Sequence, residues 1–210
     1  ILANRNSPSQ GVLSGPTDAI TQVEKLCRKN GFKTVRLPVS AAFHSSLVKE
    51  AQAPFSQAIE TMDLVPSDIP VFSNTTGAPY PADTEKAKEL LAGHLLSPVD
   101  FISEIKHLFN SGVRTFVEVG PKSVLTGLVT SILNGQNFQS IALDASQGKR
   151  SGIADLAETL CHLASLGRDC RGYLDTHPGH GSGLRRESDG LPEGLPPLCR
   201  ARRCDPVRQR

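Results

Sequence analysis

The sequence predicts an α/β fold in which a mostly parallel sheet is covered by helices on both faces. Three observations support this class. Strand-like runs alternate with amphipathic helical patterns along the chain. In 32–39, Val35, Leu37 and Val39 alternate with more polar neighbours, with the period of two that is typical of a strand. The run 115–119, Thr-Phe-Val-Glu-Val, is the best candidate for a central strand.

The first forty residues predict a strand–helix–strand unit. Residues 6–15 indicate a polar turn and a short strand, and Thr17 is the expected N-cap of the helix that follows. Gly31 is placed to end that helix, and the strand 32–39 comes next. The apolar face of the helix has helical spacing and consists of Ala19, Ile20, Val23, Leu26 and Cys27.

The remaining elements continue the alternation. Pro54 is expected to kink or restart a helix over 46–62. Ser97 is the expected N-cap, and Pro98 the first turn, of a helix that Gly112 is expected to end. A Gly/Pro turn is predicted at 76–79. The other predicted helices are 84–96, 122–133 and 151–166, and the other strands are 70–74, 115–119 and 140–143.

Charge is divided unevenly along the chain. Residues 1–170 carry 15 Lys and Arg against 16 Asp and Glu, whereas 171–210 carry 8 Arg against 5 acids. The nearly neutral first part indicates neither a nucleic-acid partner nor an anionic membrane surface. No apolar run approaches the roughly 20 residues of a membrane span, and no signal peptide is visible. The five cysteines are odd in number and irregularly spaced, which favours reduced thiols in a cytoplasmic protein.

The end of the chain differs in composition from the rest. From Arg171 onward there are 6 Gly and 5 Pro, no Lys and no periodicity. We expect 167–210 to be a disordered tail that buries no core, and our hypothesis is that it is a non-native, for example frameshifted, end. Its arginines lack the interleaved aromatics of an RNA-binding arm. The Cys and His residues from Cys161 onward match no spacing of a zinc site, so no metal is predicted.

His44 is the candidate catalytic residue. It lies where the strand 32–39 gives way to a helical pattern, the position at which α/β enzymes tend to place working groups. The alternative is a histidine that only fills a turn.

Four segments, in their order and spacing, resemble one family. The segments are Asn6-Ser7-Pro8 with Val12-Leu13-Ser14-Gly15-Pro16, Leu37-Pro38-Val39-Ser40 with Ala42-Phe43-His44-Ser45, Leu95-Leu96-Ser97-Pro98-Val99 with Phe101, and Phe116-Val117-Glu118-Val119-Gly120-Pro121 with Leu125. The family they resemble contains the acyltransferase domains of type I polyketide and polyunsaturated fatty-acid synthases and the malonyl-CoA:acyl-carrier-protein transacylases, and the resemblance covers 1–166.

The resemblance implies a two-part fold. It consists of a hydrolase-like parallel-sheet subdomain, incomplete here, with part of an inserted ferredoxin-like small subdomain. On this mapping 1–40 form the C-terminal half of the small subdomain, and 41–166 form the C-terminal part of the large one.

The resemblance also implies ping-pong acyl transfer through an acyl-serine. His44 matches the family base, and the backbone carbonyl of His94 maps to the group that orients its ring, so that the His94 side chain is incidental. Phe43 matches a position of malonyl-selecting members, where a ring occupies the space of an α-methyl group. Core packing is the alternative for Phe43. Asn6 resembles an asparagine near the acyl pocket, and a turn-forming role is its alternative.

The nucleophile of the family is missing from this sequence. The chain holds no Gly-x-Ser-x-Gly pentapeptide: Gly11–Gly15 and Gly179–Gly183 both carry the serine one place late. We therefore expect a truncated piece that is inactive alone. We expect it to expose apolar faces and open strand edges, and hence to have low solubility or to self-associate when expressed alone.

The implied ligands and partners follow from the same resemblance. They are malonyl-CoA, an acyl carrier protein bearing phosphopantetheine and a neighbouring ketosynthase domain, with no cofactor bound covalently. Two alternatives stay open: a related acyl-thioester hydrolase, and a non-catalytic docking or structural fragment.

Overall fold

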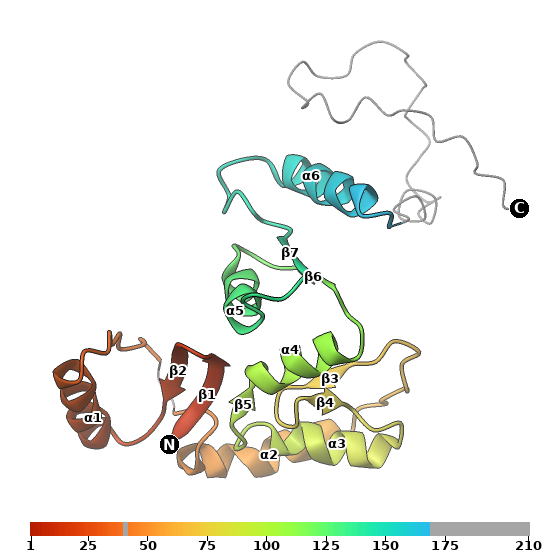
Figure 1. Ribbon diagram of the computed structural model, residues 1–210. Helices are drawn as coiled ribbons and strands as arrows, with labels where there is room; N and C mark the ends of the chain where they lie inside the picture. Colours follow the sequence, from red (N-terminus) through yellow and green to blue (C-terminus); the bar gives the residue numbers. More distant parts are fainter. Residues whose placement is uncertain (40–41, 169–210) are drawn as a thin grey trace, which may run out of the picture. The chain divides into compact units, whose positions relative to one another are not determined.

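The structure is a computed structural model that describes residues 1–39 and 42–168 (Figure 1). These residues divide into two compact units. Unit 1 comprises Ile1–Val119 with Ser123–Ala142, and unit 2 comprises Gly120–Lys122 with the described residues from Leu143 onward. The predicted tail, 167–210, lies outside the described residues except for Gly167 and Arg168. The division of the chain at residues 40 and 166 stays a prediction.

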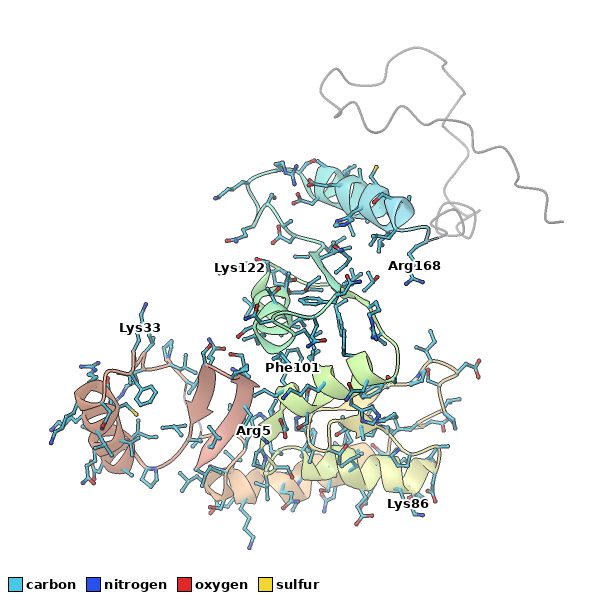
Figure 2. The ribbon with its side chains drawn as sticks, in the orientation of Figure 1. Arg5, Lys33, Lys86, Phe101, Lys122 and Arg168 are labelled. Atoms are coloured by element: carbon cyan, nitrogen blue, oxygen red, sulfur yellow. The ribbon has the colours of Figure 1, made fainter. Side chains whose placement is uncertain are left out.

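A three-stranded sheet begins unit 1. Strands β1 (Leu2–Ser7) and β2 (Gln10–Leu13) form an antiparallel hairpin, and β1 pairs in parallel with β5 (Val99–Asp100) on its other side. Arg5 on β1, which is labelled in Figure 2, donates to Asp100 Oδ2 at 2.8 Å and so ties the two strands together. The prediction of a polar turn and one strand over 6–15 missed β1, whose residues show no regular alternation.

Helix α1 (Thr17–Lys29) follows the hairpin, but its start differs from the prediction. The N-cap is Pro16, and no side chain caps the helix, so the assignment of Thr17 as N-cap was wrong. Thr17 is instead the first helical residue, and its carbonyl accepts from the Thr21 hydroxyl at 2.8 Å. Gly31 adopts a φ of 81° directly after the helix, where a left-handed conformation favours glycine.

The predicted strand over 32–39 does not form. The polar side chains of this segment lie along α1: Arg28 Nε donates to Thr34 Oγ1, and Arg36 donates to Thr21 Oγ1, both at 2.9 Å. Its apolar side chains remain exposed, at 74 % for Val35. The alternation is real, but a strand needs a hydrogen-bonded neighbour, and no strand among the described residues pairs with this segment.

The middle of unit 1 is mostly helical. A single 3₁₀ turn, η1 (Ser46–Val48), leads into α2 (Lys49–Glu60), which runs through Pro54 without restarting there. The predicted strand 70–74 is shortened to β3 (Phe72–Ser73), which pairs with β4 (Ala78–Pro79) across the predicted turn. Gly77 in that turn has a φ of 62°, and a Cβ there would lie 3.0 Å from the backbone nitrogen of Glu104. Helix α3 (Thr84–Gly93) is capped by Asp83, which accepts from two backbone N–H groups.

Helix α4 (Phe101–Asn110) begins later than predicted. Asp100 is its N-cap and accepts from the backbone N–H of Ser103 at 3.1 Å. Pro98 precedes β5 and lies outside the helix, and Ser97 instead donates its hydroxyl to the Gly93 carbonyl at 2.9 Å. Both assignments failed because Val99 and Asp100 pair with β1, and this parallel pairing between distant segments is invisible in local sequence.

The core of unit 1 lies between α4 and α5 (Val124–Ile132). Strands β6 (Thr115–Glu118) and β7 (Gln139–Ala142) pair in parallel, which confirms both predicted strands to within one residue. The buried cluster consists of Ile105, Val129, Ile132 and Leu133, with Phe101, Phe116 and Phe138 packed against it. The described strands make three small sheets rather than the single covered sheet that we expected, because β3, β4 and β5 are only two residues long.

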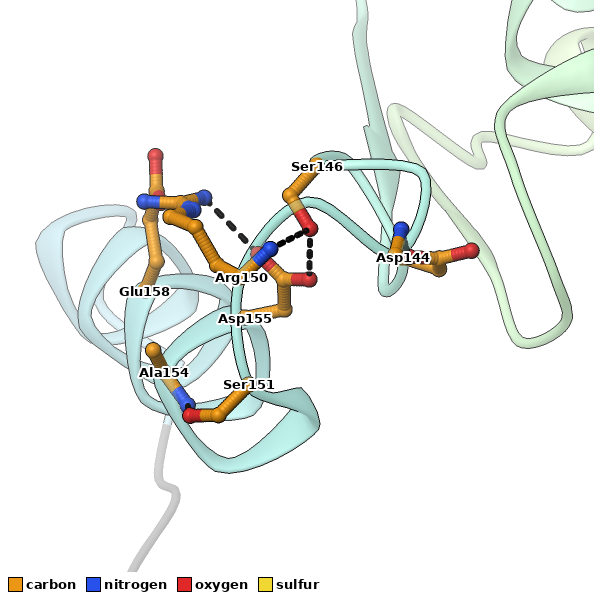
Figure 3. A network of polar contacts seen from close by, with 8 residues as sticks. Asp144, Ser146, Arg150, Ser151, Ala154, Asp155 and Glu158 are labelled. Atoms are coloured by element: carbon orange, nitrogen blue, oxygen red, sulfur yellow. Dashed lines mark hydrogen bonds and ion pairs between the residues drawn. The ribbon is translucent and has the colours of Figure 1, made fainter.

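Unit 2 is organised by polar contacts at the start of α6 (Gly152–Ser165) (Figure 3). Asp155 is 3 % exposed and accepts from Ser146 Oγ at 2.5 Å and from Arg150 at 2.8 Å. Ser151 caps the helix through the backbone N–H of Ala154. The helix predicted over 151–166 is thereby confirmed. No helix within the described ranges is long and apolar enough to cross a membrane, and these ranges contain no group of three or more metal-ligating side chains.

Candidate active site

Hydrogen bonds fix the conformation of the chain at His44. Its φ is 58°, a left-handed conformation that is uncommon for a residue with a side chain. The backbone N–H of His44 donates to the carbonyl of Leu95 at 3.1 Å. The next residue, Ser45, is buried; its hydroxyl donates to the Ala42 carbonyl at 2.5 Å and accepts from the Leu47 N–H, which begins η1. His44 is therefore fixed at the turn that leads into the helix.

Two carbonyl oxygens face one nitrogen of the His44 ring. Nδ1 lies 3.2 Å from the His94 oxygen and 3.0 Å from the Ser97 oxygen. Carbonyl oxygens only accept hydrogen bonds, so this environment favours the neutral tautomer with hydrogen on Nδ1. The lone pair is then on Nε2, and an imidazole in this state can take a proton from a donor at Nε2.

The end of α3 presents these carbonyls. His94 is the C-cap residue of α3, and the chain then turns, with the backbone N–H of Ser97 bonded to the carbonyls of Gly93 and His94. The last carbonyls of a helix carry partial negative charge and accept hydrogen bonds, so the end of α3 presents an acceptor to the Nδ1–H of His44.

The side chain of His94 lies beside His44. The two ring centroids are 5.4 Å apart, with 32° between the ring planes. His94 Nε2 is buried and makes no hydrogen bond within the described residues. Burial, and then the charge of His44, lowers the pKa of His94 below its ordinary value. The His94 side chain is therefore less readily protonated than an ordinary histidine.

Asn6 and Phe43 are the two other predicted site residues. Asn6 is on β1 and donates to the Gln10 side chain at 3.3 Å, within its own hairpin. The Phe43 side chain is 49 % exposed and is not part of the buried core of the described residues. The structure therefore brings His44 and His94 together. Phe43, which directly precedes His44 in the sequence, has an exposed side chain.

One group of the site and one helix cap escaped the sequence analysis. The Ser97 carbonyl was missed because a backbone oxygen leaves no signature in sequence, and Ser97 itself was interpreted as a cap. Glu118, at the end of β6, accepts from the N–H groups of Leu125 and Thr126 and from the Thr126 hydroxyl, and so caps α5. A carboxylate between a strand and a helix start was the available signal.

The pKa of Glu118 reflects this capping. Desolvation alone would raise it, but the hydrogen bonds from Thr126, Leu125 and the Val124 backbone outweigh desolvation and hold the pKa below its ordinary value. The ionised carboxylate is therefore the form that the start of α5 binds.

Comparison with known proteins points to one family. A family model described as the acyl transferase domain matches residues 1–155. The malonyl CoA-acyl carrier protein transacylase of Bacillus subtilis (strain 168) is 37% identical over 160 residues, which are 75% of this chain and 49% of the relative. A polyunsaturated fatty acid synthase component from Thraustochytrium sp. is 34% identical over 175 residues, 82% of this chain and 6% of the relative.

Solved structures agree with this result. The acyltransferase domain from the second module of the salinomycin polyketide synthase superposes with a TM-score of 0.72 at 28% identity, over 88% of this chain and 43% of that chain. The malonyl CoA-acyl carrier protein transacylase from Clostridium perfringens gives 0.68 at 29% identity, over 80% and 51%. The chain thus spans about half or less of these relatives, and it belongs to the acyl transferase domain family.

Proposed function

We propose that this chain supplies the histidine base for transfer of a malonyl group from coenzyme A to an acyl carrier protein, in fatty-acid or polyketide synthesis. Relatives named as malonyl CoA-acyl carrier protein transacylases support this substrate pair. A solved complex of a type II polyketide synthase acyl-carrier protein with its malonyl-transacylase, which this chain matches at 27% identity with a TM-score of 0.65, supports a carrier-protein partner. A ketosynthase domain of the same synthase is a further proposed neighbour.

The proposed reaction has two half-reactions. In the first, a serine oxygen attacks the malonyl thioester carbonyl while His44 Nε2 takes the serine proton; the carbon–sulfur bond breaks, and the coenzyme A sulfur leaves with that proton. In the second, Nε2 takes the proton of the phosphopantetheine thiol, whose sulfur attacks the acyl-serine; the serine oxygen then regains the proton. Atoms and charge balance in both half-reactions.

The observation that carries this proposal is the placement of His44 Nδ1 against two carbonyl oxygens. A ring with hydrogen on Nδ1 offers Nε2 as its basic nitrogen. When Nε2 takes a proton, the Nδ1 hydrogen stays on the two carbonyls, so the ring keeps its orientation. This orientation is the part of a serine–histidine unit that a backbone can provide without a carboxylate.

The proposal extends to the acyl pocket. The exposed Phe43 ring, one residue before the base, is free to contact an acyl group held near Nε2. A ring in the space of an α-methyl group would favour malonyl over methylmalonyl by roughly 1–3 kcal/mol. Asn6 is proposed to lie near that pocket, and its contact with Gln10 leaves the Asn6 carbonyl oxygen available.

The 210 residues contain no Gly-x-Ser-x-Gly elbow that could hold the nucleophilic serine of this reaction. We therefore propose that this chain alone forms no acyl-enzyme. Incubation with radiolabelled malonyl-CoA, followed by denaturing electrophoresis, tests this directly. A stoichiometric label on the 210-residue chain would contradict it.

A chimera tests the role of His44. The part of the Bacillus subtilis transacylase that this chain does not match is joined to the chain, and malonyl loading of an acyl carrier protein is measured. We expect His44→Ala to lower the loading rate by about 10²- to 10⁴-fold, the usual contribution of a general base. His107→Ala is the matched control, because the His107 ring contacts Phe72 rather than the site. Equal rates for the two variants would refute the assignment.

The hydrolase alternative gives a different product from the same chimera. A transferase makes malonyl-carrier in proportion to the carrier protein added. A hydrolase releases free malonate at a rate that is independent of the carrier.

A further inference from the structure

We infer that the imidazole of His94, and not its carbonyl alone, is a positioning residue for His44: the His94 ring forms a wall that keeps His44 Nδ1 on the two carbonyls and Nε2 free. The inference rests on the proposed role of His44 as base. The observations that carry it are the ring contact at 5.4 Å, the burial of His94 Nε2 without a partner among the described residues, and the C-cap position of His94.

The carbonyl contacts by themselves leave the His44 ring under-restrained. The torsion that turns an imidazole about its Cβ–Cγ bond has broad, roughly two-fold preferences. Rotation of the ring out of its present plane about this bond would turn Nδ1 away from both oxygens. The His94 ring lies beside His44 with 32° between the planes, close enough to oppose that rotation sterically.

His94 suits this role because it stays uncharged. Its Nε2 is shielded from solvent, and burial, followed by the charge of His44, lowers its pKa. A neutral ring does not repel a proton that arrives on His44.

Charged side chains on the surrounding elements have partners of their own. On α3, Lys88 pairs with Glu85 and donates to the carbonyl of Glu60 at the end of α2. Between β1 and β5, Arg5 pairs with Asp100. Burial lowers the pKa of His94 most, and His44 is the charged group that lowers it further.

The two functions of His94 are linked through one backbone position. The carbonyl that accepts from Nδ1 and the ring that forms the wall belong to the same residue, at the end of α3. Any shift of α3 would therefore move both supports of His44 together.

The test uses the 210-residue chain labelled with ¹⁵N, and reads the His44 ring nitrogens by long-range ¹H–¹⁵N correlation at a mildly alkaline pH. In the unsubstituted chain we expect one protonated nitrogen, Nδ1, and one bare nitrogen, Nε2. His94→Phe keeps a flat ring and should keep this pattern. His94→Ala removes the wall, and the ratio of the Nδ1–H to the Nε2–H form should fall by roughly tenfold, the equivalent of one lost hydrogen bond of about 1.4 kcal/mol.

Several results would overturn the inference. One is an unchanged His44 tautomer in His94→Ala. Another is an equal change in His94→Phe and His94→Ala, which would assign the effect to loss of a nitrogen rather than of a wall. If His94→Ala does not fold, as judged by its amide spectrum, His94→Ser offers a second small side chain suited to a helix end, and an unchanged tautomer there would count against the inference. His107→Ala should leave the His44 signals unaltered.

This test is independent of acyl transfer. The ring spectra need no serine nucleophile, substrate or carrier protein. Loss of the His44 tautomer in His94→Ala would support the wall even if the chimera failed to load malonyl groups. An active chimera with unchanged ring spectra would refute the wall alone.

Discussion

Asp155 offers the sharpest test of how α6 is held. The carboxylate is 3 % exposed and accepts from Ser146 Oγ and from Arg150. Replacement by alanine leaves the Ser146 hydroxyl without its acceptor, which costs about 1 kcal/mol, and removes a charge-assisted bond worth about 1.5–3 kcal/mol. The upper part of that range does not apply, because the Arg150 side chain is 49 % exposed and keeps Glu158. The expected loss is therefore about 2–3 kcal/mol.

Native-state hydrogen exchange of the α6 amides measures this loss. Asp155→Ala should accelerate exchange by roughly 30- to 150-fold, and Asp155→Asn, which keeps one acceptor oxygen, by roughly tenfold. Glu158→Ala is the matched control, since it removes an exposed partner of the same arginine and should change the stability by less than about 0.5 kcal/mol. If Asp155→Ala and Glu158→Ala accelerate exchange equally, burial of the carboxylate is not what holds the helix.

Three further predictions follow from other elements. Glu118→Ala uncaps α5 and should lower the free energy of unfolding in urea by about 1–2 kcal/mol. Because the folded pKa of Glu118 is lowered, this stabilisation is present above the unfolded pKa of about 4.3 and is lost as the pH falls through the folded pKa. A variant whose loss of stability is no larger at neutral pH than in acid would contradict the capping. The lowered pKa of His94 means that the unfolded chain binds the proton more readily, so stability should fall as the pH drops below about 6.5, and His94→Gln should flatten that fall in urea unfolding measured across this range. Gly77→Ala should lower the free energy of unfolding by about 1–3 kcal/mol, since the added Cβ would lie 3.0 Å from the Glu104 backbone at a residue with a left-handed conformation. An unchanged melting temperature would show that the turn relaxes freely.

Elements set by local sequence were predictable. The helix over 151–166 was found because its apolar spacing and its Ser151 start are local signals, and β6 and β7 were found from short apolar runs. Gly31 was correctly placed at the end of α1 because a left-handed residue there is a local requirement.

Features that depend on distant partners were not predictable from the sequence. The segment 32–39 has the alternation of a strand, but pairing is not encoded in a single run, and Val35 and Leu37 stay exposed. The helix start at Ser97 was misplaced because β5 pairs with β1 from the other end of the chain. In the site, the histidine was visible in sequence, whereas the Ser97 carbonyl that faces it belongs to the backbone and was not.

The left-handed backbone at His44 has a consequence for engineering. This conformation costs an L-residue with a side chain about 1 kcal/mol, and glycine avoids that cost. His44→Gly would relieve the backbone but lose the Nδ1 contacts with the His94 and Ser97 carbonyls, which are worth a similar amount, so a selection that rewards only thermal resistance has little reason to keep the proposed base. A variant library of this domain therefore needs an activity screen alongside any heat challenge.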